Sequence, residues 1–378
     1  MTSLIAFAVL AAGFVADGSA RVEARGGPTE GGEDPNSVGI SADLLGRVSG
    51  PDGALRFGFS PSAVRAQGNQ LFARGFGEAE LRLRESAHVR LRQALGYGSL
   101  DLSPVAAVTG RGPVQPPAGT TFVSVEESAT SLQADVAASR RLRFAGSAAW
   151  LISGGADAAA RATFPLSRGP LVRGSAEWAA THTDTLRIAV QGFDHRYSNG
   201  QRSSVAAATV GWQSRVARST EVAVSLGPGI GRARTLASQD ASTIFYAVGA
   251  VDVHSLPLRN LSASLGAGVE PLGDPLSGDL VERGSLRASV TWDRHRSIAI
   301  TGQLVGSVAL TSGSGGPTSP QAGDRYLQGE VGATVPLDPR SSLAAGLRGA
   351  LVSRPLLSQP SDQWVAFVRY VAQLPLLR

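Results

Sequence analysis

The sequence predicts an all-β protein, a transmembrane antiparallel β-barrel of about eighteen strands, with sixteen or fourteen strands as alternatives. Three observations predict this fold. Apolar and polar side chains alternate with a period of two along most of the 378 residues. The alternating arms run for about ten residues or more, near the length at which a tilted strand crosses a bilayer. Tight turns and longer loops follow one another along the chain, as they do in membrane-spanning β-barrels.

The clearest example of the alternation is the segment Ser285–Leu310. Two arms flank a polar turn, Asp293–Arg296, and in each arm the apolar residues share one parity while Arg, Ser, Thr and Gln occupy the other. Successive side chains of a strand leave on opposite sides, so this period indicates a β-hairpin. The apolar faces of the two arms are Leu286, Ala288, Val290 and Trp292, then Ile298, Ile300, Leu304, Val308 and Leu310.

The same reading divides the chain into a leader, a tail and a barrel. Leu4–Ala16 is an apolar run too short to span a membrane as a helix, and the small residues Gly18–Ala20 follow it. We therefore expect a signal peptide over residues 1–20, a mobile Gly/Pro/Glu-rich tail over 21–36, and the barrel domain over 37–378.

Within the barrel domain we expect about four strands before Gly98 and about fourteen from Ala129 onward. One of the fourteen is Ala158–Phe164, where Ala158, Ala160, Ala162 and Phe164 share a parity. Gly98–Gly119 is rich in Pro and Gly, is weakly patterned, and could fold inside the barrel.

Composition excludes several classes of site. The sequence has no Lys, so it has neither a P-loop lysine nor a Schiff-base lysine, and with no Cys it has no disulfide and no thiolate metal site. The five His residues are scattered without metal-ligand spacing, so no metal or cofactor is expected. The net charge of +5 comes from dispersed Arg residues, so no nucleic-acid partner is expected.

All five tryptophans lie on the apolar parity, which is where a membrane barrel places its interfacial anchors. Trp150, Trp178, Trp212 and Trp292 are expected late in strands that run toward the short turns, and Trp364 at the start of another strand. The alternative is that they are core residues of a soluble β-sandwich, whose apolar face is buried.

The polar parity is rich in arginine, and in a barrel it lines the lumen. The predicted lumen-lining residues are Arg82, Arg84, Arg90, Arg92, Arg143, Arg173, Arg187, Arg283, Arg287, Arg348 and Arg369. Four of them, Arg82, Arg84, Arg90 and Arg92, fall on two adjacent strands, where Glu80 is the one acidic residue expected to offset them. This excess predicts a positive lumen that favours anions. The alternative is cross-strand pairing with carboxylates that stiffens the wall.

Leu4–Ala20, the alternating arms and the order of turns and loops together resemble bacterial outer-membrane β-barrels of porin size over nearly the whole mature chain. The resemblance implies a location in the bacterial outer membrane, contact with its lipid and insertion by the barrel-assembly machinery. It also implies a channel for passive diffusion of small hydrophilic solutes, with anions as a finer expectation and the oligomeric state open.

Three rival functions remain open at this stage. The first is a non-conducting barrel with a structural or surface role, and the second is a soluble β-repeat protein. The third is a lipid-modifying barrel enzyme, because Asp194, His195 and Ser198 have the side chains of a serine hydrolase. All three polar residues lie near an expected loop, where such residues are common, so we expect no catalytic site and no enzyme.

Overall fold

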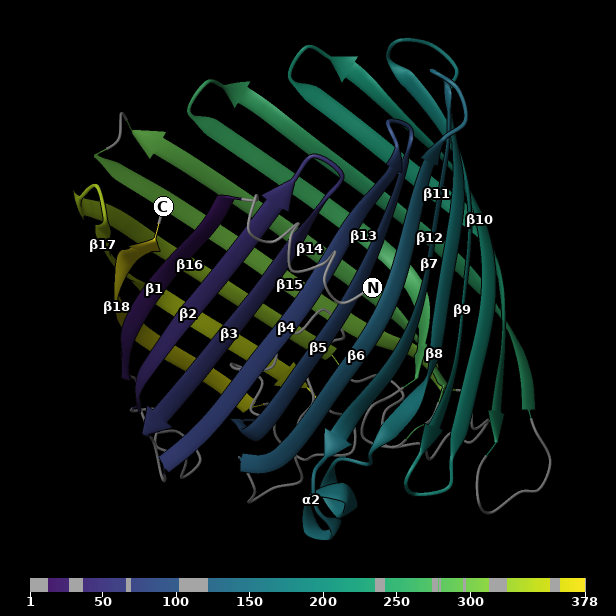
Figure 1. The fold of residues 1–378 in the computed structure, drawn as a ribbon. Helices are drawn as coiled ribbons and strands as arrows, with labels where there is room; N and C mark the ends of the chain where they lie inside the picture. Colours follow the sequence, from purple (N-terminus) through teal and green to yellow (C-terminus); the bar gives the residue numbers. More distant parts are fainter. Residues whose placement is uncertain are drawn as a thin grey trace, which may run out of the picture.

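The computed structural model describes residues 13–26, 37–65, 69–101, 122–234, 242–273, 278, 280–294, 297–312, 325–353 and 361–377. These residues form one antiparallel sheet of 18 strands that closes on itself, because β1 pairs with both β2 and β18 (Figure 1). Closure leaves no strand edge exposed, which is a condition for a sheet surrounded by lipid. The predicted fold class is therefore confirmed.

The strands run through the sheet in chain order, each antiparallel to the next. Those of the first half are β1 (Gly13–Gly26), β2 (Ser37–Gly50), β3 (Gly53–Arg65), β4 (Asn69–Arg84), β5 (Ala87–Asp101), β6 (Phe122–Ala137), β7 (Leu142–Gly155), β8 (Ser167–Ala179) and β9 (Asp184–Tyr197). Those of the second half are β10 (Arg202–Ala217), β11 (Thr220–Arg234), β12 (Ser242–Leu258), β13 (Leu261–Gly273), β14 (Leu280–Arg294), β15 (Ile298–Ser312), β16 (Arg325–Asp338), β17 (Ser341–Ser353) and β18 (Ser361–Leu377). A short helix, α2 (Ala158–Thr163), lies between β7 and β8.

Tight turns join strands at one end of the barrel. Two residues connect β2 to β3, β4 to β5, β10 to β11, β12 to β13 and β16 to β17. The other end carries α2 and the longer connections, and in Figure 1 the short turns lie at the upper rim and α2 at the lower. The predicted alternation of turns and loops is confirmed. No helix among the described residues is long and apolar enough to cross a membrane.

The expected strand over Ala158–Phe164 is wrong, because Ala158–Thr163 forms the helix α2. Asp157 is its N-cap, and its carboxylate accepts a hydrogen bond of 2.8 Å from the amide of Ala160. Alanine is the best helix former, and a capped run of alanines satisfies a helix as well as an alternating pattern does.

Because Ala158–Phe164 is not a strand, the strand before it, β7, runs in the direction opposite to the expected one. Trp150 lies late in β7, which starts at a short turn and runs toward the long-loop end. The prediction that Trp150 sits near the short turns is therefore wrong. Trp178, Trp212 and Trp292 do lie in strands that run toward the short turns, and Trp364 begins β18 at the long-loop end.

The N-terminal boundaries also differ from the predicted ones. Gly13–Gly26 is a strand, so the expected mobile tail is wrong for residues 21–26 and the barrel begins before residue 37. The alternation here is weak, with Gly18, Ala20 and Ala24 on the parity of Val22, which is why an apolar leader seemed the better match. Cleavage after Ala20 stays a prediction, but it would remove more than half of β1. Residues 1–12 and 27–36 lie outside the described residues.

The predicted count of 18 strands is confirmed, but the strands are distributed differently along the chain. Five strands precede the Pro/Gly-rich interruption and thirteen follow it, because β1 is an additional strand and Ala158–Thr163 is a helix. Gly98–Asp101 belongs to β5, and the rest of the predicted interruption, residues 102–119, lies outside the described residues.

Candidate functional site: the wall of the lumen

The side of the sheet that encloses the lumen is identified by a cavity of about 500 Å³. Residues of nine consecutive strands, β6 to β14, line it, and they can meet around one space only on the concave side. On most strands these residues alternate with apolar ones; Arg173 and Ser175, for example, alternate with Val172 and Ala176. The polar parity therefore faces inward.

The apolar parity faces outward. Leu226 is 67% exposed and Val210 is 62% exposed, values that no water-soluble core would show. All five tryptophans share this parity, so the β-sandwich interpretation, in which they are core, is wrong. Their role as interfacial anchors stays a prediction.

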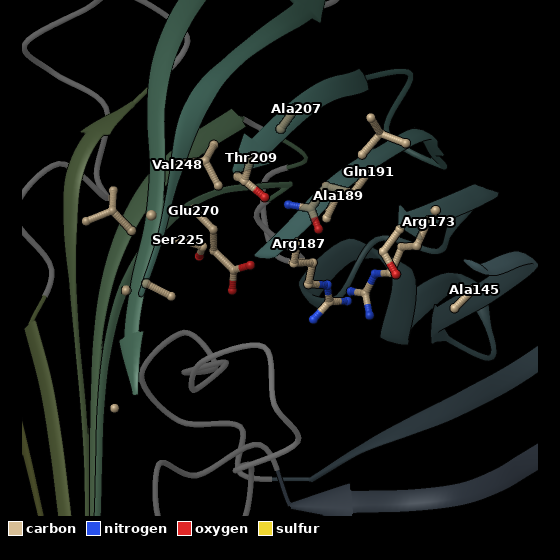
Figure 2. A pocket seen from close by; sticks show the side chains of 18 of the residues that line it. Ala145, Arg173, Arg187, Ala189, Gln191, Ala207, Thr209, Ser225, Val248 and Glu270 are labelled. Atoms are coloured by element: carbon tan, nitrogen blue, oxygen red, sulfur yellow. The ribbon is translucent and has the colours of Figure 1, made fainter. Parts of the chain in front are cut away.

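Arginines and neutral polar groups share the lining of the cavity. Arg173 on β8 and Arg187 on β9 point into it, with Gln191 and Thr209 nearby and Glu270 of β13 at the other side (Figure 2). Arg287 of β14 also lines it. Three guanidinium groups and one carboxylate therefore line the cavity.

The ion pairs on this wall are long, and their side chains are exposed to solvent. Arg187 Nε lies 3.5 Å from Glu177 Oε1, with 56% of the arginine side chain exposed. Arg287 lies 3.4 Å from Asp252 across the intervening strand β13, and 75% of its side chain is exposed. Gly266 lies between them, where a Cβ would come within 2.9 Å of the Arg287 Nε. Exposed pairs of this kind contribute about 0–1 kcal/mol, so both guanidiniums stay available.

Two further arginines of this region have no carboxylate partner among the residues that the structure describes. Arg173 faces the cavity, and Arg143 lies on β7 opposite Glu177 in register without forming an ion pair. Arg283, on β14, donates a hydrogen bond of 3.3 Å to the Ser307 hydroxyl.

A second group of arginines lies where β1 and β18 close the barrel, and it is buried. We call Glu23, Glu330, Arg348, Arg369 and Phe367 the seam cluster. Arg369 Nε lies 2.6 Å from Glu23, and Arg348 lies 2.6 Å from Glu330 and 4.0 Å from Glu23. The Phe367 ring stacks beneath both guanidiniums, at 5.5 Å from Arg348 and 5.0 Å from Arg369. Only 8% of the Glu23 side chain and 10% of the Arg348 side chain are exposed.

A third group joins β3, β4 and β5, and it corrects the sequence prediction. Arg56 and Arg90 each lie 3.5 Å from both Glu78 and Glu80. Glu80 was expected to be alone in offsetting the arginines of this hairpin, but Glu78 points to the same side and is almost fully buried. The predicted strand starts at Ala79 and therefore leaves Glu78 out, although Glu78 has the same parity as Glu80.

The other arginines of that hairpin remain without a carboxylate in the described part of the chain. Arg92 stacks over the Phe76 ring at 4.9 Å. Arg82 and Arg84 are exposed and approach the short-turn end of β4. The predicted cluster of four like charges thus consists of one paired guanidinium, Arg90, and three unpaired ones. Their effect on selectivity stays a prediction.

The residues considered for hydrolase chemistry are engaged in structural contacts. Arg202 donates to both Asp194 oxygens, at 2.7 and 2.6 Å. The Ser198 hydroxyl accepts a hydrogen bond of 3.0 Å from the amide of Leu166. Among the described residues, no group of His, Asp and Glu side chains could hold a metal ion.

Known structures share this architecture. The FrpB iron transporter of Neisseria meningitidis (F5-1 variant) matches with a TM-score of 0.57 at 9% identity, over 95% of this chain and 70% of that one. The outer-membrane protein OpdK of Pseudomonas aeruginosa matches with a TM-score of 0.52 at 12% identity, over 96% and 99%. OccK11 of the same organism gives 0.51 at 11% identity, over 96% of each chain. At such identities the likeness establishes the fold, a bacterial outer-membrane barrel of porin size, as the sequence predicts.

Sequence similarity is more specific than the shared fold. No curated protein matches the sequence. A family model does match residues 89–373, from the start of β5 to within β18, which is well over half of the chain. The chain with this arginine-lined barrel therefore belongs to the EpsX exopolysaccharide export family.

Proposed function

We propose that this protein is an outer-membrane channel whose wet lumen passes hydrophilic molecules, and that its substrate is a secreted polysaccharide. The observation that carries the proposal is the polar cavity on the lumen wall, where guanidinium, amide and hydroxyl groups from seven of the nine lining strands face one space. Family membership supplies the direction, from the cell outward.

The chemistry of a sugar chain suits this wall. Each sugar carries several hydroxyl groups that exchange hydrogen bonds with water, and Gln, Ser and Thr side chains can replace some of those bonds during passage. Movement through such a channel needs binding that is weak and repeated along the wall, and it involves no covalent step. The exposed apolar outer face supports contact with lipid, and insertion by the barrel-assembly machinery is part of the proposal.

A matched pair of substitutions tests the proposal. Thr209 lines the cavity, and its neighbour Val210 is 62% exposed on the outer face. Thr209→Trp should lower single-channel conductance in a planar bilayer and polysaccharide secretion by a strain that depends on this gene, whereas Val210→Trp should change neither. Normal secretion in a strain that lacks the protein, or a wild-type barrel that does not conduct, would contradict the proposed function.

A second candidate is passive diffusion of small hydrophilic solutes with a preference for anions. The exposed arginines without carboxylate partners in the described structure, Arg82, Arg84 and Arg92 among them, favour it. In that case the deletion strain should lose uptake of a small anion such as phosphate and keep its secreted polysaccharide. A barrel that neither conducts nor affects secretion would favour the structural rival.

A further inference from the structure

We propose that the cavity formed by Arg173, Arg187, Gln191 and Thr209 is a binding subsite for a carboxylate-bearing sugar, so that the exported polysaccharide is acidic. This inference rests on the proposed function and names its substrate class. The site lies on the lumen wall of β8, β9 and β10. Arg173, Gln191 and Thr209 are near the middle of their strands, and Arg187 is nearer the short-turn end of β9.

The first support is the state of the two arginines. Arg173 has no carboxylate partner among the described residues, and Arg187 has one long contact of 3.5 Å to a carboxylate that is itself 41% exposed. Both side chains extend from adjacent strands into the same cavity (Figure 2). A guanidinium presents a planar pair of donors that fits the two oxygens of a carboxylate, and two of them on one wall select a negative group.

The second support is the set of neutral polar side chains that line the cavity with the two arginines. Gln191 lies opposite Arg173 in the β8–β9 register, and Gln133, Ser147, Thr209 and Ser225 line the same space. These groups offer donors and acceptors at several heights, which suits the hydroxyl groups of a sugar ring more than it suits a compact inorganic anion. The cavity of about 500 Å³ has room for one or two sugar units.

The one acidic group that lines the cavity does not cancel this field. Glu270 comes from β13, on the side away from Arg173, and lies opposite Arg283 in the β13–β14 register. A third guanidinium, that of Arg287, also lines the cavity and lies 3.4 Å from Asp252. Arg173 has no carboxylate partner among the described residues, so a carboxylate-bearing sugar meets at least one guanidinium that no protein carboxylate neutralises.

Equilibrium binding to the detergent-solubilised full chain tests the subsite without requiring transport. The probes are hexagalacturonate and maltohexaose, which are acidic and neutral chains of the same length, titrated by calorimetry at one fixed low ionic strength. The wild type should bind the acidic probe at least about tenfold more tightly than the neutral one. Arg173→Gln with Arg187→Gln should remove most of that difference and leave maltohexaose unaffected.

The matched control is Arg82→Gln with Arg84→Gln, which removes the same charge from another part of the lumen wall and should weaken binding by less than about twofold. Arg173→Lys keeps the charge but loses the planar pair of donors, so its affinity should fall between those of wild type and Arg173→Gln. Equal weakening by both double variants would show a diffuse field in place of a subsite and overturn the proposal, as would equal binding of the two probes. A barrel that conducts and supports secretion but shows no acidic preference would refute this inference and leave the proposed function standing.

Discussion

Two stretches of the same inner wall use arginine in opposite ways. In the seam cluster Arg348 is 10% exposed and lies within 4.0 Å of two carboxylates, with an aromatic ring beneath it. In the cavity Arg187 is 56% exposed, and Arg173 has no carboxylate partner among the described residues. Both groups lie on the inward parity of strands in one sheet, so the difference comes from the side chains that surround each arginine.

The buried and the exposed arginines therefore have different roles in the wall. A guanidinium that is buried between two carboxylates is not accessible to a ligand, and removing a partner leaves a buried charge unpaired. An exposed guanidinium contributes little to stability and can bind a passing anion. The seam cluster therefore fixes the closure of β1 on β18, and the cavity is the part of the wall available to substrate.

The largest expected effect concerns the strand that brings Glu23 to the seam. A chain that starts at Arg21 would lack residues 13–20 of β1, which pair with both β2 and β18. The lipid-exposed groups left unpaired cost several kcal/mol each, so we expect no closed barrel. The measurement is heat-modifiable gel mobility after refolding in detergent, with a chain that starts at Gly13 as the control. A folded barrel from the shorter chain would restore the predicted cleavage after Ala20.

The next effect is that of one carboxylate in each region. Glu23→Gln leaves Arg25, Arg348 and Arg369 near an uncharged group at a buried site and should lower the free energy of unfolding by about 3 kcal/mol or more. The matched change on the open wall, Glu177→Gln, removes a partner that is 41% exposed and should cost no more than about 0.5 kcal/mol. Urea unfolding of both variants in lipid vesicles measures the difference. Equal losses would remove the distinction between the two regions.

The hairpin Ser285–Leu310 and the strand β1 show where the sequence was sufficient to predict the structure and where it was not. The period of two in Ser285–Leu310 was enough to predict a hairpin, because a lipid-facing side and a water-facing side impose opposite polarity on neighbouring residues. In β1 the lipid-facing residues around Val22 are small, so the alternation was too faint to separate a strand from a leader. Glu23 was therefore assigned to a tail, and the seam cluster could not be anticipated.

Ala158–Phe164 illustrates the opposite failure. Alanine is small and apolar enough for a strand and is the best helix former, so its spacing fits both periods. The cap at Asp157 was the signal that decides, through its hydrogen bond to the amide of Ala160. No sequence pattern predicts which arginines form ion pairs, because the ion pairs of Arg348 and Arg56 depend on the register between neighbouring strands.

The comparison of the two regions presumes that the inward parity meets water and the outward parity meets lipid. Ile300 lies on the outward parity beside Trp292 in register, and Thr301 follows it on the inward one. Ile300→Arg should cost about 2–4 kcal/mol if it lies near the bilayer midplane, whereas Thr301→Arg should be tolerated. Urea unfolding in lipid vesicles gives both values. Similar losses at these two neighbours would reverse the assignment of the faces and with it the site.

The smallest expected effect is on ion selectivity, and it extends the comparison to the β4–β5 hairpin, which contains both kinds of arginine. Arg90 lies 3.5 Å from Glu78 and Glu80, whereas Arg82, Arg84 and Arg92 have no carboxylate partner in the described structure. If pairing decides the role, replacing these three with Gln should lower the anion-to-cation permeability ratio by about twofold, more at low salt than at high salt. Arg90→Gln alone should instead lower stability, because Glu78 and Glu80 would then share Arg56 as their ion-pair partner among the described residues. It should also lower the ratio, because one negative charge of the pair is left unbalanced. The reversal potential across a salt gradient, measured together with urea unfolding, separates the two outcomes. A wild-type channel with no anion preference, or a triple variant that loses as much stability as Arg90→Gln, would show that the exposed arginines are structural as well, and the division between the paired and unpaired parts of the wall would fail.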